Sequence, residues 1–196
     1  MRICYIGAVQ SVINNLRELG SEVDFQPSDE CDGIVITEQL TTTKLLQMRC
    51  KYRNTPIIVK GYSGIHYTNI NVLVFDENEI KKFYEDYGIK TLQECKDTLK
   101  DFKIHYLVVA LTKEQIEEHV KYSLPKVRQE GVKITNKQVA TAKDNLTALV
   151  GYIYTKEGTL SAEAINNANV GAALSVAGLA DENLKDYYLD IKFKKD

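Results

Sequence analysis

Asp32-Gly33-Ile34-Val35-Ile36-Thr37-Glu38 is the segment that indicates the fold most directly. It is a short run of branched apolar residues between polar ones, which is the pattern of a strand buried on both faces. It is the third of several such runs along the chain, and helical segments separate most of them. The sequence therefore predicts that residues 33–37 form the central strand of a small open α/β sheet.

Four further runs share this pattern, at residues 2–7, 22–25, 56–60 and 71–75. The spacing of apolar residues predicts helices near residues 9–19 and 41–54, and a closing helix over residues 79–87. The link over residues 26–32 is too short for a full helix, which leaves one layer thin or puts the second strand at an edge. We therefore expect residues 1–90 to form a doubly wound, parallel, five-stranded α/β sheet of the flavodoxin type.

This order of elements resembles the receiver domain of response regulators, in its degenerate, CheY-like pseudo-receiver form. Receivers that accept phosphate carry an acidic pair after strand one, aspartate after strand three, Ser/Thr after strand four and lysine after strand five. The corresponding segments here are Gly7-Ala8-Val9-Gln10, Thr37-Glu38, Lys60-Gly61 and Asp76-Glu77. The resemblance implies a receiver-like domain that cannot be phosphorylated and that docks a protein partner.

The carboxyl ends of parallel strands are where such folds bind ligands. A candidate ligand cleft there would draw on six residues: Gly7, Gln10, Thr37, Glu38, Ser63 and His66. The loop over residues 61–66 places a serine between glycines and a histidine three residues later, which are residue types that bind anions or support nucleophilic catalysis. The alternative interpretation is a flexible crossover between two strands that lacks a helix.

The sequence supports no assignment of catalytic residues, cofactor or metal. It contains no G-x-x-x-x-G-K-[ST] motif, and the single glycine after the first strand is not a dinucleotide fingerprint. The four cysteines are widely spaced and show no C-x-x-C pair, so we expect reduced, mostly buried thiols in a cytosolic protein.

The second half predicts a linker helix over residues 91–101 and a helical α+β domain over residues 102–196. Within this domain we expect a strand at 102–111, a long helix at 137–154, two short helices at 161–167 and 172–177 around a tight turn at Asn169-Val170-Gly171, and a strand at 187–193. The two strands could pair with each other. The order resembles a winged helix-turn-helix over residues 134–196.

The segment in the recognition position, residues 171–183, has no Lys or Arg and carries Asp181 and Glu182, so it would repel DNA. Candidate nucleic-acid contacts lie elsewhere: Lys126, Arg128, Lys133, Lys137 and Lys143. The alanine-rich surface suits helix–helix packing and is a candidate protein interface: Ala172, Ala173, Val176 and Ala177.

The charge composition gives no electrostatic support for nucleic acid as a general partner. The formal net charge of the 196 residues is −2, and neither half is strongly basic: residues 1–98 carry 11 Lys/Arg and 14 Asp/Glu, residues 99–196 carry 14 and 13. The first residues enter a strand directly and no long apolar run is uninterrupted, so we expect no signal peptide, no membrane span and a cytoplasmic location.

Three hypotheses remain. The first is a non-catalytic regulatory or adaptor protein that works by protein–protein docking, with homodimerisation included. The second is a DNA-binding accessory or regulatory protein of a mobile element. The third is a small α/β enzyme or nucleotide-binding protein that uses the loops after the first and fourth strands.

Overall fold

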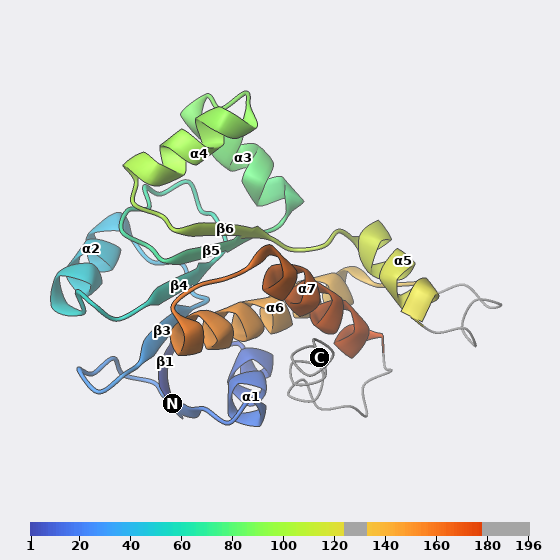
Figure 1. The fold of residues 1–196 in the computed structure, drawn as a ribbon, viewed down its shortest axis with the longest axis horizontal. Helices are drawn as coiled ribbons and strands as arrows, with labels where there is room; N and C mark the ends of the chain where they lie inside the picture. The colour runs from blue at the N-terminus through green and yellow to red at the C-terminus, as the bar shows by residue number, and fades with distance from the viewer. Residues whose placement is uncertain (124–132, 178–196) are drawn as a thin grey trace.

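The computed structural model describes residues 1–123 and 133–177. They form one six-stranded, all-parallel sheet with helices packed on it (Figure 1). Its strands are β1 (Arg2–Ile6), β2 (Glu22–Asp24), β3 (Gly33–Ile36), β4 (Ile57–Lys60), β5 (Val72–Phe75) and β6 (Tyr106–Val109). Their order in the sheet is β2-β1-β3-β4-β5-β6, which is the flavodoxin-like order extended by one strand. The predicted parallel α/β sheet is therefore confirmed, and β2 lies at an edge as the short link before β3 suggested.

The helices are α1 (Gln10–Glu18), α2 (Thr42–Lys51), α3 (Glu77–Tyr87), α4 (Leu92–Asp101), α5 (Lys113–Ser123), α6 (Asn136–Glu157) and α7 (Ala162–Val176). Local sequence explains where several begin and end. Asp76, Thr91 and Thr135 each close a capping box at a helix start, and Gly88 ends α3 in the left-handed conformation with φ +65°. Of the helices in the described ranges, none has the length and apolar character needed to cross a bilayer.

The predicted number of strands was wrong, because β6 adds a sixth. It pairs in parallel with β5, in the register Val72↔Tyr106 to Phe75↔Val109. The α3–α4 segment supplies the crossover that a parallel partner requires. We expected this strand in a second domain, where it could pair with residues 187–193, and those residues lie outside the described ranges. The structure does not show the separate second domain.

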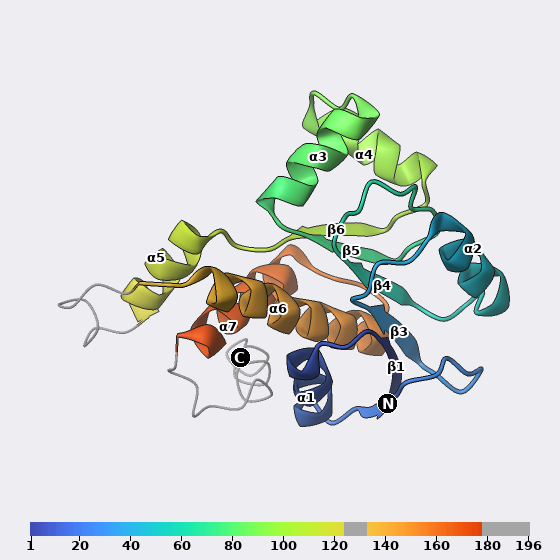
Figure 2. The same ribbon diagram turned by 180° about the vertical axis from the view of Figure 1, so that it is seen from behind.

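Helices cover both faces of the sheet (Figures 1 and 2). Helices α1, α6 and α7 pack on one face, against alternate strand residues such as Ile3 and Val35. Helices α2, α3 and α4 pack on the other, against neighbours such as Cys4 and Ile34. Because side chains of a strand alternate between faces, runs buried on both sides are apolar at every position.

Helix α6 is the central element of the first face. Its Leu146, Leu149, Val150 and Ile153 side chains are buried in the core shared with α1 and the sheet, and each such burial contributes about 1.5–3 kcal/mol. The helix approaches β3 so closely that a Cβ on Gly151 would lie 2.8 Å from Cγ2 of Val35. The backbone at Gly151 and the side chain of Val35 therefore fit together only because residue 151 has no side chain.

Helix α7 corrects a second prediction. We expected a tight turn at Asn169-Val170-Gly171, but the helix continues through these residues. These residues meet tertiary neighbours instead: Asn169 donates a hydrogen bond from Nδ2 to the Val109 carbonyl at 3.2 Å, and Gly171 is buried. The local signal for a turn was overridden by packing. The strand that the winged helix-turn-helix resemblance also needs falls at residues 187–193, outside the described part.

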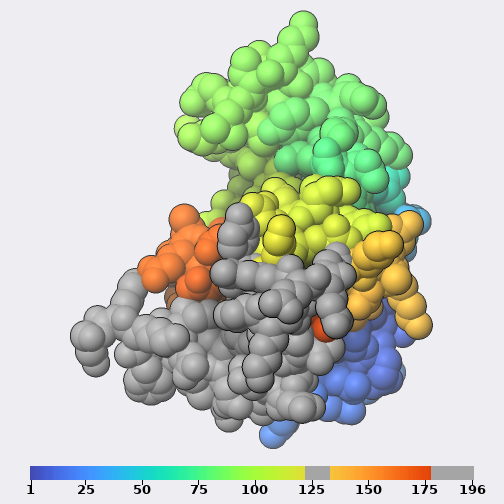
Figure 3. Space-filling model, turned by 90° about the vertical axis from the view of Figure 1, so that its right-hand side faces the viewer, coloured from blue at the N-terminus to red at the C-terminus, as the bar shows by residue number. Residues whose placement is uncertain are grey.

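Helix α5 lies at the end of the sheet where the strands finish. Figure 3 shows this end, with α5 (yellow) between the α3–α4 region (green) and the start of α6 (gold). Ile116 and Val120 of α5 pack with Ile134 and with Ala173 and Val176 of α7. The last three helices thus form a small core that joins the main one along α6.

Replacing Gly151 by leucine tests the packing of α6 on β3. We expect a net loss of up to about 2 kcal/mol in the free energy of unfolding, since overpacking costs about 1–3 kcal/mol and leaving glycine in a helix gains about 1 kcal/mol. Urea denaturation measures the loss. The matched control is Ala140→Leu on the exposed side of the same helix, which should stay within about 0.5 kcal/mol of wild type. Equal stabilities of the two variants would contradict this packing.

Candidate functional site

The strands β1, β3, β4 and β5 all end at one edge of the sheet, where ligands bind in folds of this kind. The chain leaves β1 toward α1 on one face, and leaves β3 toward α2 on the other. The crevice between β1 and β3 is therefore the first place to look for a site.

That crevice is filled by the protein's own side chains. The Tyr5 hydroxyl lies 2.6 Å from Oγ1 of Thr37 and accepts a hydrogen bond from the Val9 N–H at 2.9 Å. A Cβ on Gly7 would lie 2.1 Å from the same Thr37 oxygen. Gly7 is thus needed for the close approach of β1 to β3, and Tyr5, only 1% exposed, occupies the space that a ligand would need.

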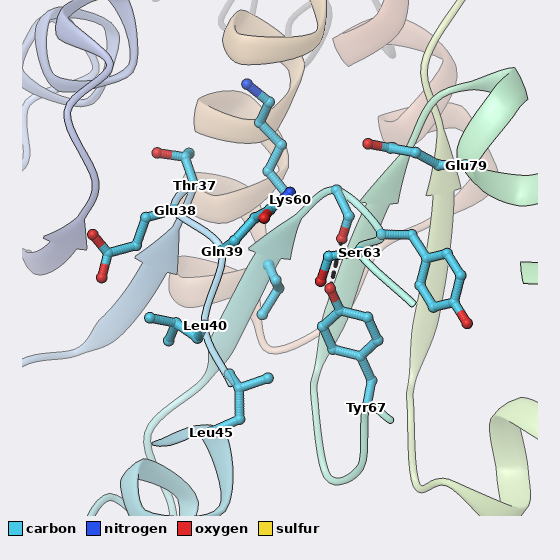
Figure 4. A pocket seen from close by; sticks show the side chains of 12 residues that line it. Thr37, Glu38, Gln39, Leu40, Leu45, Lys60, Ser63, Tyr67 and Glu79 are labelled. Carbon is cyan, nitrogen blue, oxygen red and sulfur yellow. Dashed lines mark hydrogen bonds between the residues drawn. The ribbon is translucent and has the colours of Figure 1, made fainter. Parts of the chain in front are cut away.

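A pocket of about 130 Å³ opens one strand further along, between the ends of β3 and β4 (Figure 4). It is lined by Thr37, Glu38, Gln39, Leu40, Leu45, Val59, Lys60, Gly61, Tyr62, Ser63, Tyr67 and Glu79. Three of the six predicted cleft residues, Thr37, Glu38 and Ser63, lie here together. The other lining residues come from β4, from the loops after β3 and β4, and from α2 and α3.

The remaining three predicted residues do not line the pocket. Gln10 donates from Nε2 to Oδ1 of Asn14 on the exposed side of α1. His66 packs edge-on against Phe102, with ring centroids 4.4 Å apart, and its Nδ1 lies 3.2 Å from the Tyr87 hydroxyl. The loop between β4 and β5 thus contains no helix, as the alternative interpretation held, and it directs His66 toward α3 and α4.

Charged side chains from α6 reach the same edge. Lys60, the last residue of β4, pairs with Asp144, and Lys143 pairs with both Asp76 and Glu79 at the start of α3. The Lys143 ammonium lies 2.9 Å from Oδ2 of Asp76, and its side chain is only 9% exposed. The two ion-pair groups fasten the amino-terminal half of α6 to the ends of β4 and β5.

The Asp76 carboxyl shows how these charges interact. Partial burial, the largest single effect, pushes its pKa upward. The hydrogen bond and charge of Lys143, together with the backbone N–H groups of Glu79 and Asn78, outweigh burial and leave the pKa below its ordinary value. The structure therefore favours the ionised form of Asp76.

The sequence analysis did not identify Asp76, Glu79 and Asp144 as site residues. A signal was present: Lys143 and Asp144 interrupt the apolar stripe of a long helix, where charged residues are buried only if they are paired. Which strand ends they would meet depends on the path of α6 across the sheet, which has no local signature.

Three of the five candidate nucleic-acid residues lie in the described ranges, on or just before α6. Lys143 is buried and ion-paired, so its ammonium does not face solvent. Lys133 and Lys137 are exposed near the start of α6. Lys126 and Arg128 lie outside the described residues.

The candidate protein interface is internal. Ala172, Ala173 and Val176 are at most 9% exposed, and together with Ala177 they pack into the cores around α5, α6 and α7. In the described residues, this alanine-rich surface packs against helices of the same chain.

Comparison with protein-family models, with curated proteins and with solved structures found no match to this chain. Within residues 1–123 and 133–177, no group of three or more His, Cys, Asp or Glu side chains is arranged to hold a metal ion. Three of the four cysteines are buried and Cys50 is exposed, all as free thiols.

Replacing Lys143 by methionine tests the ion-pair group. Two carboxylates would then face each other without a cation, so we expect the free energy of unfolding at pH 7 to fall by about 1–3 kcal/mol, less than for a fully buried pair because Asp76 is 40% exposed. Urea denaturation measures the fall. Lys81→Met, which breaks the exposed pair with Glu77, is the control and should cost at most about 0.5 kcal/mol.

The same variant has a defined pH dependence. A carboxyl group whose folded pKa is depressed stabilises the protein above its unfolded pKa near 4, and this contribution is lost as the pH falls through the folded value. We therefore expect the stability gap between wild type and Lys143→Met to shrink when urea denaturation is repeated at pH 3. A gap that stayed constant from pH 7 to pH 3 would contradict the role of the Asp76 charge.

Proposed function

We propose that the chain is a non-catalytic regulatory or adaptor protein that docks a protein partner through a receiver-like structure without a phosphoacceptor. The observation that carries this proposal is the size of the pocket at the ends of β3 and β4. Sites for small molecules and cofactors have volumes of about 300–1,000 Å³. A pocket of about 130 Å³ is too small for a nucleotide and large enough for one side chain of a partner.

The polar groups at this edge support the same proposal. At the end of β3 the Thr37 hydroxyl is held by Tyr5, and after β5 the Asp76 carboxylate is held by Lys143. Lys60 at the end of β4 is held by Asp144. Each of these groups serves a contact within the chain, which suits a preformed binding surface better than a set of groups that must move protons or phosphate.

The two other hypotheses lose support from the same contacts. A nucleotide or a catalytic site would need the crevice at Gly7, which Tyr5 fills. DNA binding would need clustered basic groups, and of the five candidates Lys143 is buried among carboxylates. Docking of a protein requires neither an open crevice at Gly7 nor a cluster of basic groups.

The test combines ligand screening with reconstitution. ATP, GTP, NAD and a DNA duplex at low salt are added to the purified chain, and its melting temperature and its mass by light scattering are measured. Proteins cross-linked to the chain in its own cells are then purified and mixed with it. We expect a complex of defined stoichiometry with one such protein, or with a second copy, and no response to nucleotide or DNA.

Two outcomes would reverse the proposal. A ligand present at 100 times its Kd adds about 2.7 kcal/mol of stability, so a nucleotide that binds the folded chain would raise the melting temperature clearly. Such a shift would favour the enzyme or nucleotide-binding hypothesis. A mass shift with DNA that disappears with added salt would favour the DNA hypothesis.

A further inference from the structure

The floor of the pocket between β3 and β4 is apolar. Leu40, Leu45, Val59, Tyr62 and Tyr67 line it, and all five are at most 7% exposed. The Tyr67 hydroxyl is already used, since it donates to the Gly61 carbonyl at 2.9 Å. An apolar cavity of about 150 Å³ in another protein accommodates one benzene molecule, so a cavity of this size holds the apolar part of one side chain.

The rim of the pocket is polar and carries excess negative charge. Figure 4 shows Glu38 on one side of the pocket and Glu79 on the other, with Gln39 and Ser63 between them. Lys60 also lines the pocket, but its side chain extends toward α6, where it pairs with Asp144. The cation among the lining residues is therefore engaged, whereas two carboxylates remain at the rim.

Neither rim carboxylate is fully neutralised. Glu79 shares the single ammonium of Lys143 with Asp76. Glu38 has Lys44 at 3.4 Å, but the two side chains are 44% and 55% exposed, and ion pairs that exposed are worth about 0–1 kcal/mol. A cation arriving from solvent would add the missing positive charge and could displace Lys44 at little cost.

Resting on the proposed function, we propose that this pocket is the docking point for a lysine or arginine side chain of the protein partner. The methylene stem lies on Leu40, Val59 and Tyr67, and the charged head stays at the rim beside Glu38 and Glu79, as long basic side chains do when they cover apolar surface. The proposal therefore describes part of the partner's surface. It carries a projecting basic side chain without acidic neighbours, which Glu38 and Glu79 would repel.

The test titrates the full chain, labelled with ¹⁵N, with four probes while amide chemical shifts are followed. The probes are Ac-Ala-Ala-Lys-Ala-Ala-NH₂, the same peptide with arginine, the same peptide with norleucine, and n-pentylamine. We expect the lysine and arginine peptides to shift residues 37–40 and 59–63 with a Kd on the order of millimolar, because one side chain makes few contacts. The uncharged norleucine peptide should bind roughly two- to fivefold more weakly.

Four variants test whether the charges at the pocket rim, and not charge changes elsewhere on the surface, set the affinity for the lysine peptide. Glu38→Gln should weaken binding of the lysine peptide roughly two- to fivefold, and Lys44→Gln should strengthen it by a similar factor, because it removes the competing cation. Glu77→Gln and Lys81→Gln alter an equally exposed ion pair on α3, outside the pocket lining, and should leave the affinity unchanged.

Several results would overturn the inference. They are a norleucine peptide that binds as tightly as the lysine peptide, shifts that map outside the pocket, and no shift with any probe. Pentylamine binding more tightly than the peptides would point to a free amine and not to a protein side chain. If one of these results is found but a stoichiometric protein complex still forms, the proposed docking function is retained and only the basic-side-chain inference is wrong. A response to nucleotide or DNA would instead contradict the docking function.

Discussion

The packing of α6 across β3, β4 and β5 is the constraint on which the rest of the structure depends. Its apolar side chains fill the core on one face of the sheet, and Gly33 and Gly151 allow the helix and β3 to approach. A Cβ on Gly33 would lie 2.2 Å from Oγ1 of Thr155, so both glycines are needed for this contact. Because α6 is fixed in this way, Lys143 and Asp144 arrive at the ends of the strands.

The charged residues of α6, Lys143 and Asp144, determine which charges are paired at the carboxyl ends of the strands. Burying Lys143 and Asp144 costs desolvation energy, which their carboxylate and ammonium partners offset. Together with the exposed pair of Glu38 and Lys44, these ion pairs set four carboxylates, at Glu38, Asp76, Glu79 and Asp144, against three ammonium groups. Tyr5 fills the neighbouring crevice, and the small pocket with a negative rim lies one strand further along this edge.

Local signals and tertiary contacts contributed differently to this outcome. The capping boxes at Asp76, Thr91 and Thr135 and the left-handed glycine after α3 are short-range effects, and the structure has them where the residue types require. The prediction of a turn at Asn169-Val170-Gly171 was wrong because long-range contacts, and not short-range effects, decide the backbone there. Its residues face α6 and β6, and contacts over a distance of 60 residues outweighed the local preference for a turn.

The amino-acid sequence alone was enough to predict the strands β1 to β5, their parallel arrangement and the presence of Thr37, Glu38 and Ser63 at the ends of strands, and it left the edge position of β2 as one of two alternatives. These follow from hydrophobic periodicity and from loop lengths, which are local properties. Only the tertiary structure decided that β6 joins the same sheet, that α6 crosses it, and that Lys143 meets Asp76 and Glu79. The β5–β6 pairs join residues 34 positions apart and the Lys143 contacts join residues 67 and 64 positions apart. Their energies depend on burial and mutual geometry, which no local pattern encodes.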